Sequence, residues 1–158
     1  MRSHDTDIFR RLAFLFVFPV VFASCGGGGG GGVVQPPGTA PTVVTKFASL
    51  SGAREVPPVT TSATGSGVLA VDTSTGAISG FIVTAGLSAT AAHIHDNVVG
   101  SNGPVIVPLA GGPNIWTVPD GATLTAAQIT KFSAGGLYYN AHTVANPGGE
   151  IRGQIDLP

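Results

Sequence analysis

Three histidines are the residues of this chain best suited to chemistry: His93, His95 and His142. One residue separates His93 from His95, so on a β-strand both rings lie on one face while Ala92 and Ile94 lie on the other. Imidazole suits zinc and copper, and three imidazoles with one open position form a catalytic type of metal site. The pattern therefore predicts a copper or zinc site, provided that the strand holding His142 lies beside the strand holding the other two.

A polar network without a metal is the alternative for these histidines. Asp96, Asn140 and Glu150 offer hydrogen-bond partners for the rings. A serine nucleophile is disfavoured, because no serine stands in a Gly-x-Ser-x-Gly elbow that leads from a strand into a helix. Metal binding and a hydrogen-bonded network thus remain the two interpretations, and no catalytic residue is predicted.

A second group of polar residues surrounds Arg152 near the end of the chain. On a strand, Arg152 and Gln154 share one face, while Ile151 and Ile155 share the other and face the core. The carboxylates that Arg152 could pair with are Glu55, Glu150 and Asp156. Because a planar guanidinium suits fixed carboxylates, we expect a structural lock. A wall of a ligand site is the alternative role.

These residues must be positioned by a domain that spans residues 46–158 and consists of short strands. Gly, Thr, Val and Ala are abundant and charged residues make up only 9% of the chain, which favours β-structure over helices. We expect a hairpin at 67–72 and 77–85, a strand at 89–95 and two final strands at 137–143 and 150–156. A capping box at Thr125 and Gln128 predicts one short helix. The fold class is therefore all-β and mainly antiparallel, either a β-sandwich or a flattened Greek-key barrel.

Residues 1–24 have the features of a signal peptide. Three arginines precede an apolar stretch at 12–23, which has 12 residues and contains Pro19, and is therefore too short to span a bilayer as a helix. The stretch leads to Cys25, the only cysteine in the chain, in a Phe-Ala-Ser-Cys sequence that resembles a bacterial lipobox. We expect Cys25 to be lipidated and to hold the protein on a membrane. Plain secretion after cleavage near Ala23 is the alternative.

The segment 25–45 is expected to be a flexible tether between the lipid and the domain. It contains seven consecutive glycines at 26–32, followed by a proline-rich stretch. The protein is then an exported lipoprotein of the periplasm or outer membrane, facing the envelope or the cell surface. The formal net charge of −1 leaves no basic surface, which argues against electrostatic nucleic-acid binding.

Several ordered motifs resemble those of the chordin-type CHRD domain over residues 46–157. They are Phe47-x-x-x-Leu-Ser-Gly-Ala, Glu55-Val-Pro-Pro, Ala92-His-Ile-His, Tyr139-Asn-Ala-His-Thr and Gly149-Glu-Ile-Arg-Gly-Gln. The resemblance implies a β-rich extracellular or periplasmic module. A weaker likeness in layout links the paired histidines, a Gly-Pro loop and the late His142 to copper/zinc superoxide dismutase. Because the chain lacks the disulfide pair and the full ligand set of that enzyme, the likeness argues against dismutase activity and leaves metal binding open.

Two functions follow from the sequence. The first is a non-enzymatic module, anchored to a membrane through Cys25, that binds or adheres to an unknown protein or matrix partner at the cell envelope. The alternative is a copper- or zinc-binding metalloprotein that uses His93, His95 and His142, with redox activity as one of its capacities.

Overall fold

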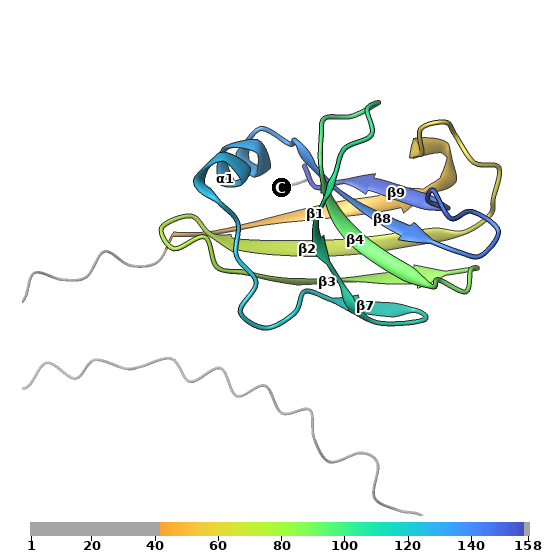
Figure 1. Ribbon diagram of the computed structural model, residues 1–158, viewed down its shortest axis with the longest axis horizontal. Helices are drawn as coiled ribbons and strands as arrows, with labels where there is room; N and C mark the ends of the chain where they lie inside the picture. Colours follow the sequence, from red (N-terminus) through yellow and green to blue (C-terminus); the bar gives the residue numbers. More distant parts are fainter. Residues whose placement is uncertain (1–41, 157–158) are drawn as a thin grey trace, which may run out of the picture. The chain divides into compact units, whose positions relative to one another are not determined.

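One nine-stranded sheet forms most of the domain (Figure 1). The computed structural model describes residues 42–156, so the expected signal peptide, Cys25 and most of the expected tether lie outside the described residues. The strands are β1 (Val43–Ser51), β2 (Thr64–Asp72), β3 (Ile78–Ala85), β4 (Ala91–Asp96), β5 (Val105–Pro108), β6 (Ala110–Gly111), β7 (Ile115–Thr117), β8 (Leu137–His142) and β9 (Ile151–Gln154). The helices are the 3₁₀-helix η1 (Gly52–Arg54) and the α-helix α1 (Ala126–Ser133).

The strands follow the order β5-β4-β8-β9-β1-β2-β3-β7-β6, and every neighbouring pair is antiparallel. The sheet curls so that β4, β8 and β9 lie over β1, β2 and β3, as Figure 1 shows. The expected all-β, mainly antiparallel fold with one short α-helix is confirmed, and its form is a nearly closed, barrel-like sheet. The expected hairpin is also present, because β2 pairs with β3 from Val71↔Ile78 to Thr64↔Ala85.

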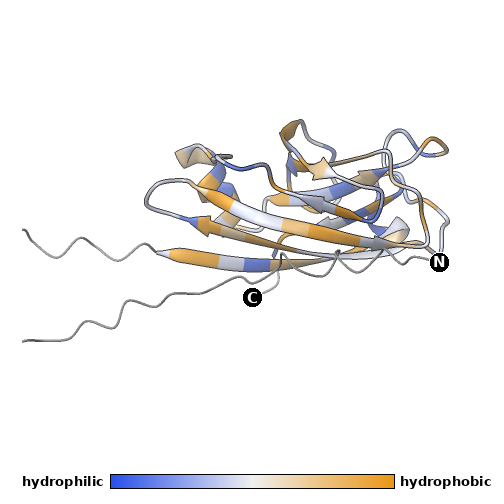
Figure 2. Cartoon of the chain, turned by 90° about the horizontal axis from the view of Figure 1, so that it is seen from below, coloured by the Kyte–Doolittle hydropathy of each residue, from blue (hydrophilic) through white to orange (hydrophobic). Residues whose placement is uncertain are grey.

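The hydrophobic core fills the space between the two halves of the sheet. Hydrophobic and hydrophilic residues alternate along the long strands (Figure 2), as expected when one face of each strand is buried. The side chains with no exposed surface include Leu69, Ile82, Ile94, Tyr139, Ala141, Ile151 and Ile155. The Tyr139 hydroxyl donates a 2.8 Å hydrogen bond to the Val68 carbonyl across this core. The expected inward orientation of Ile151 and Ile155 is therefore confirmed.

The outer face of β9 is buried as well. Arg152 is 2% exposed, and Gln154 and Glu150 are similarly hidden. The segment after β4 covers this face, because the carbonyls of Val98 and Asn97 accept hydrogen bonds from Arg152 and Gln154. Polar side chains thus form a second buried layer outside the sheet.

Helix α1 begins where its sequence predicts. The Thr125 hydroxyl accepts from the Gln128 amide and the Gln128 side chain accepts from the Thr125 amide, so the capping box is complete. Phe132 is fully buried, and the helix is followed by Gly135 with φ of 72°. In residues 42–156 no helix has the length and apolar character needed to cross a bilayer.

Two local features differ from the sequence expectation. Strand β1 begins at Val43, so the last residues of the expected 25–45 tether belong to the sheet. Helix η1 was not expected, and it forms because the chain turns closely against the segment before β2. A Cβ atom on Gly52 would collide with the carbonyl oxygen of Val59 and lie 2.6 Å from the Thr61 methyl group. Only glycine permits that approach.

Candidate metal centre

Strands β4 and β8 are direct neighbours, which is the condition that the sequence left open. In their antiparallel register His93 lies opposite Asn140, and Ala91 lies opposite His142. His142 is therefore diagonal to His93 and on the same face of the sheet, and His95 is on that face too because it follows His93 by two residues. The two strands bring all three imidazoles to the outer face.

The three rings lie close together. Their centroids are 5.6 Å apart for His93 and His95, 4.8 Å for His93 and His142, and 6.1 Å for His95 and His142. One nitrogen from each ring lies within 4.8 Å of the others. Two nitrogens bound to one tetrahedral zinc ion at roughly 2.0–2.1 Å lie about 3.4 Å apart, so the nitrogens farthest from each other would have to approach by roughly 1.4 Å through side-chain rotation to share one ion.

Backbone carbonyls fix the orientation of two of the rings. Nδ1 of His95 lies 2.9 Å from the Gly103 carbonyl oxygen, and Nδ1 of His142 lies 2.9 Å from the Pro147 carbonyl oxygen. A carbonyl oxygen only accepts, so both Nδ1 atoms carry hydrogen and each Nε2 atom has a lone pair. Metal-ligating histidines are typically oriented in this way.

The two Nε2 atoms have different surroundings. Nε2 of His95 is buried and has no hydrogen-bond partner among the described residues. Nε2 of His142 lies 2.9 Å from Nδ1 of His93, which therefore donates to it. A buried lone pair without a donor is costly, whereas a cation would satisfy it.

The electrostatics keep the three histidines neutral. Burial lowers the pKa of His93 below its ordinary value, and the neighbouring His142 and His95 lower it further. Burial also lowers the pKa of His95 and of His142, although the hydrogen bonds to Gly103 and Pro147 act in the opposite direction. Neutral imidazole is the form that ligates a metal.

Tyr138 positions His95 from the neighbouring strand. The two rings stack with centroids 4.8 Å apart and an interplanar angle of 12°. The Tyr138 hydroxyl accepts a 3.0 Å hydrogen bond from the Gly103 amide, so Gly103 contacts both rings. Tyr138 is 2% exposed, and the sequence did not predict its contact with His95. Its shared parity with Asn140 and His142 was the available signal.

Arg152 makes none of the expected ion pairs. Its Nη atoms donate to the Asn102 side chain (3.3 Å), the Val98 carbonyl (3.1 Å) and the Gln154 side chain (3.4 Å), and its guanidinium lies 3.5 Å from the Tyr138 ring centroid. Within residues 42–156 the only salt bridge joins Lys131 and Asp96. The segment after β4 supplies neutral acceptors where a carboxylate was expected, so the expected lock is not an ion pair.

Glu150 holds neighbouring segments together by accepting hydrogen bonds from uncharged donors. Its carboxylate accepts from the hydroxyls of Thr61 (2.9 Å) and Thr143 (2.6 Å) and from the Asn146 amide (3.3 Å). These hydrogen bonds, that of Thr143 first, lower its pKa. They fasten the segment after β8, whose Pro147 carbonyl orients His142. Glu150 is therefore a positioning residue for the cluster.

Glu55 lies beside the cluster without joining it. The Asn140 amide donates a 2.8 Å hydrogen bond to its carboxyl group, which is 5% exposed. Burial raises the pKa of Glu55 to about 7, although the nearby Arg152 acts to lower it. Gly149 leaves room for this contact, since a Cβ there would lie 2.7 Å from the Glu55 Oε1.

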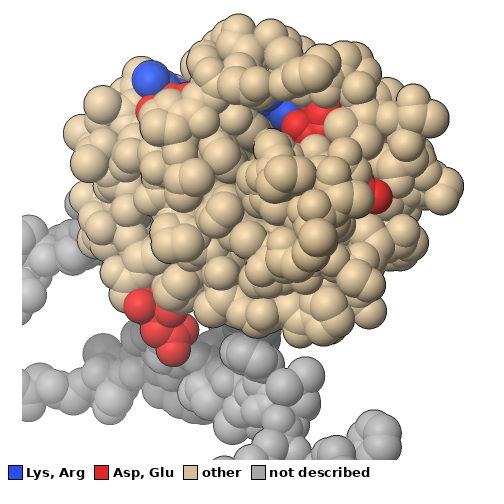
Figure 3. Space-filling model, turned by 45° about the vertical axis from the view of Figure 1, so that its right-hand side comes forward, with Lys and Arg blue, Asp and Glu red and all other residues tan. Residues whose placement is uncertain are grey.

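The fold and the three histidines define a small all-β module with few charged residues and one histidine cluster. Figure 3 shows one face of it, on which charged side chains are sparse and some of them lie in a hollow. The family model described as the CHRD domain matches residues 46–155, and the chain belongs to the CHRD domain family. Neither the curated proteins nor the solved structures contain a match to this chain. The layout likeness to copper/zinc superoxide dismutase thus has no counterpart among these comparisons.

Proposed function

We propose that this CHRD domain binds one copper or zinc ion through His93, His95 and His142. The observation that carries the proposal is the convergence of three neutral imidazoles, two of which have Nδ1 held by a backbone carbonyl, so that Nε2 remains as the ligand atom. Nitrogen donors without a thiolate suit both ions, and three ligands leave a position for a further group. Copper would add one-electron chemistry to the site, whereas zinc would not.

Metal titration of the purified chain tests this function. With Cu²⁺ and Zn²⁺ added separately at pH 7.5, we expect isothermal titration calorimetry to give one ion per chain. Each single change of His93, His95 or His142 to Ala should weaken binding at least about tenfold. Asp96→Asn is the matched control, because it alters the side chain next to His95 that pairs with Lys131 and should leave the affinity unchanged.

The pH dependence and the stoichiometry distinguish the metal site from a polar network. Protons compete with the ion, so binding should weaken below about pH 6.5 and persist at pH 7, where the three imidazoles are neutral. In a network without a metal, the alanine variants would change the melting temperature and leave metal content at background. A wild-type chain that is folded and retains no ion after dialysis would contradict the proposal.

We also propose that the chain is exported and anchored by a lipid on Cys25, so that the module binds or adheres to a protein or matrix partner at the cell envelope. The support is the 12-residue apolar stretch that ends beside the only cysteine, followed by the glycine run. Cys25→Ser should release the protein from the membrane fraction and abolish labelling by a fatty-acid analogue. Ser24→Ala keeps a small residue before Cys25 and is the matched control. Equal membrane partition of the two variants would contradict the anchor.

A further inference from the structure

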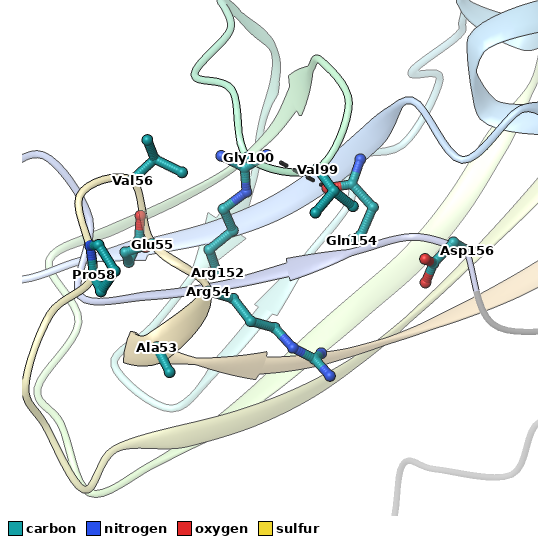
Figure 4. Close-up of a pocket in the computed structure, with 10 residues that line it drawn as sticks. All are labelled: Ala53, Arg54, Glu55, Val56, Pro58, Val99, Gly100, Arg152, Gln154 and Asp156. Carbon is teal, nitrogen blue, oxygen red and sulfur yellow. Dashed lines mark hydrogen bonds between the residues drawn. The ribbon is translucent and has the colours of Figure 1, made fainter.

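A cavity of about 560 Å³ lies next to Arg152, on the side of the domain formed by η1 and the segment after β4 (Figure 4). Its walls include Arg54, Glu55, Val56, Pro58, Val99 and Arg152. Its size falls within the range of pockets that hold small organic ligands. Its walls combine apolar and charged side chains and include none of the three histidines, so the cavity is separate from the histidine cluster.

The pocket contains a buried cation without a partner of opposite charge. Arg152 is 2% exposed, and its hydrogen bonds go to neutral oxygens of Asn102, Val98 and Gln154. No carboxylate in residues 42–156 lies within salt-bridge distance of it, and no described residue accepts from its Nε. Because an unpaired buried charge is costly, this guanidinium favours the arrival of an anion.

Glu55 offsets that charge only in part. Figure 4 shows it beside Arg152 along the pocket wall, but its carboxyl group accepts from Asn140 instead. Burial raises its pKa to about 7, so a large share of Glu55 is uncharged at neutral pH. A second cation, Arg54, also lines the pocket. The charge of Arg54 is offset by Asp156, which also lines the pocket, whereas Arg152 has no carboxylate within salt-bridge distance.

We propose that this pocket binds a small organic monocarboxylate with an apolar body. The planar guanidinium of Arg152 suits a carboxylate, and the side chains of Val56, Pro58 and Val99 offer an apolar wall for the rest of the ligand. Asp156 also lines the pocket and opposes a more highly charged anion such as a phosphate ester. This inference goes beyond the proposed metal site and does not depend on it.

The test uses 4-phenylbutyrate as the probe and 4-phenylbutanamide as its uncharged counterpart. The purified chain is titrated in EDTA, so that no metal ion can bind the carboxylate. We expect the carboxylate to bind at least about tenfold more tightly than the amide, because only the carboxylate pairs with Arg152. Equal affinities, or no binding of the carboxylate at millimolar concentration, would overturn the proposal. Tighter binding of phenyl phosphate than of the carboxylate would overturn the assigned ligand class.

Two matched surface variants locate the site without disturbing the fold. Val99 is 71% exposed and lines the pocket, whereas Val144 is 87% exposed and does not. Val99→Asp should weaken carboxylate binding roughly fivefold or more by like-charge repulsion, and Val144→Asp should leave it within about twofold. Equal effects of the two variants would place binding elsewhere. Arg152→Gln should abolish the preference for carboxylate over amide, with folding checked by circular dichroism.

Discussion

The inner face of β4, β8 and β9 is buried and the outer face is largely buried, but different interactions hold the two faces. On the inner face Ile94 and Ile151 pack against the opposite half of the sheet with no exposed surface. On the outer face His95 and Arg152 are almost equally hidden, yet their contacts are hydrogen bonds and ring stacking with Tyr138. The inner face depends on close packing, which has little directionality, whereas the outer face depends on individual donors and acceptors.

This difference explains why the candidate ligand groups lie on the outer face of these strands. A strand fixes the direction of each side chain, and the segments outside the sheet then complete the partners: Gly103 after β4 and Pro147 after β8 each orient one histidine. The same three strands therefore stabilise the domain through one face and hold reactive groups with the other. Changes on the inner face should alter stability, whereas changes on the outer face should alter stability and binding together.

The largest effect is expected on the inner face. Ile151→Ala should lower the free energy of unfolding by roughly 2–5 kcal/mol, because it removes buried methyl groups and leaves a cavity. Chemical denaturation measures the loss. Ile115 is 56% exposed on β7, so Ile115→Ala is the matched control and should cost less than about 1 kcal/mol. Similar costs for the two variants would remove the basis of the comparison between the faces.

A smaller effect is expected on the outer face at Glu150. Glu150→Ala would leave the donors of Thr61, Thr143 and Asn146 without their acceptor, at a cost of about 1–3 kcal/mol. It should also weaken metal binding, since the segment that carries Pro147 loses its attachment. Glu150→Gln retains one acceptor oxygen and should cost less in both measurements. A stability loss with unchanged metal affinity would separate Glu150 from the cluster.

The sequence predicted the directions of side chains better than their partners. The two-residue period placed His93 with His95 and Ile151 with Ile155 correctly, and the parity of β8 allowed His142 to join the first pair, because these relations follow from strand geometry alone. The capping box at Thr125 could also be predicted, because it depends only on residues that are close in the sequence.

The contacts of the outer face were not predictable from residue types. Gly103, Pro147 and Val98 contribute backbone carbonyls, which every residue has, so no pattern singles them out. The sequence instead suggested carboxylates as partners for Arg152. The charge of a side chain is known from its residue type, whereas the path of the segment that covers it is not. Neighbouring strands β4 and β8 are separated by a long stretch of chain, and their pairing also required the structure.

The smallest effect concerns the charge of Glu55 on the outer face. Its pKa is about 7 in the folded chain, against an ordinary value of 4.5, because burial disfavours the carboxylate. Between these two pH values the folded state binds a proton that the unfolded state has released. The contribution of Glu55 to stability is therefore fully present below about pH 4.5 and is lost as pH rises through about 7.

Glu55→Gln removes this titration and keeps an oxygen that can accept from Asn140. We expect the stability of Glu55→Gln relative to wild type to rise by about 1–2 kcal/mol between pH 4.5 and pH 8, a value reduced for residual solvent screening. The histidines lose stability in the opposite direction, as pH falls below 6.5, but they are common to both proteins and cancel in the difference. Glu150→Gln is the matched control: the pKa of Glu150 is lowered, so its difference from wild type should stay flat over this range. A flat profile for Glu55→Gln would mean that the carboxylate of Glu55 is stabilised by Arg152, and the positive charge of Arg152 would then be offset by Glu55.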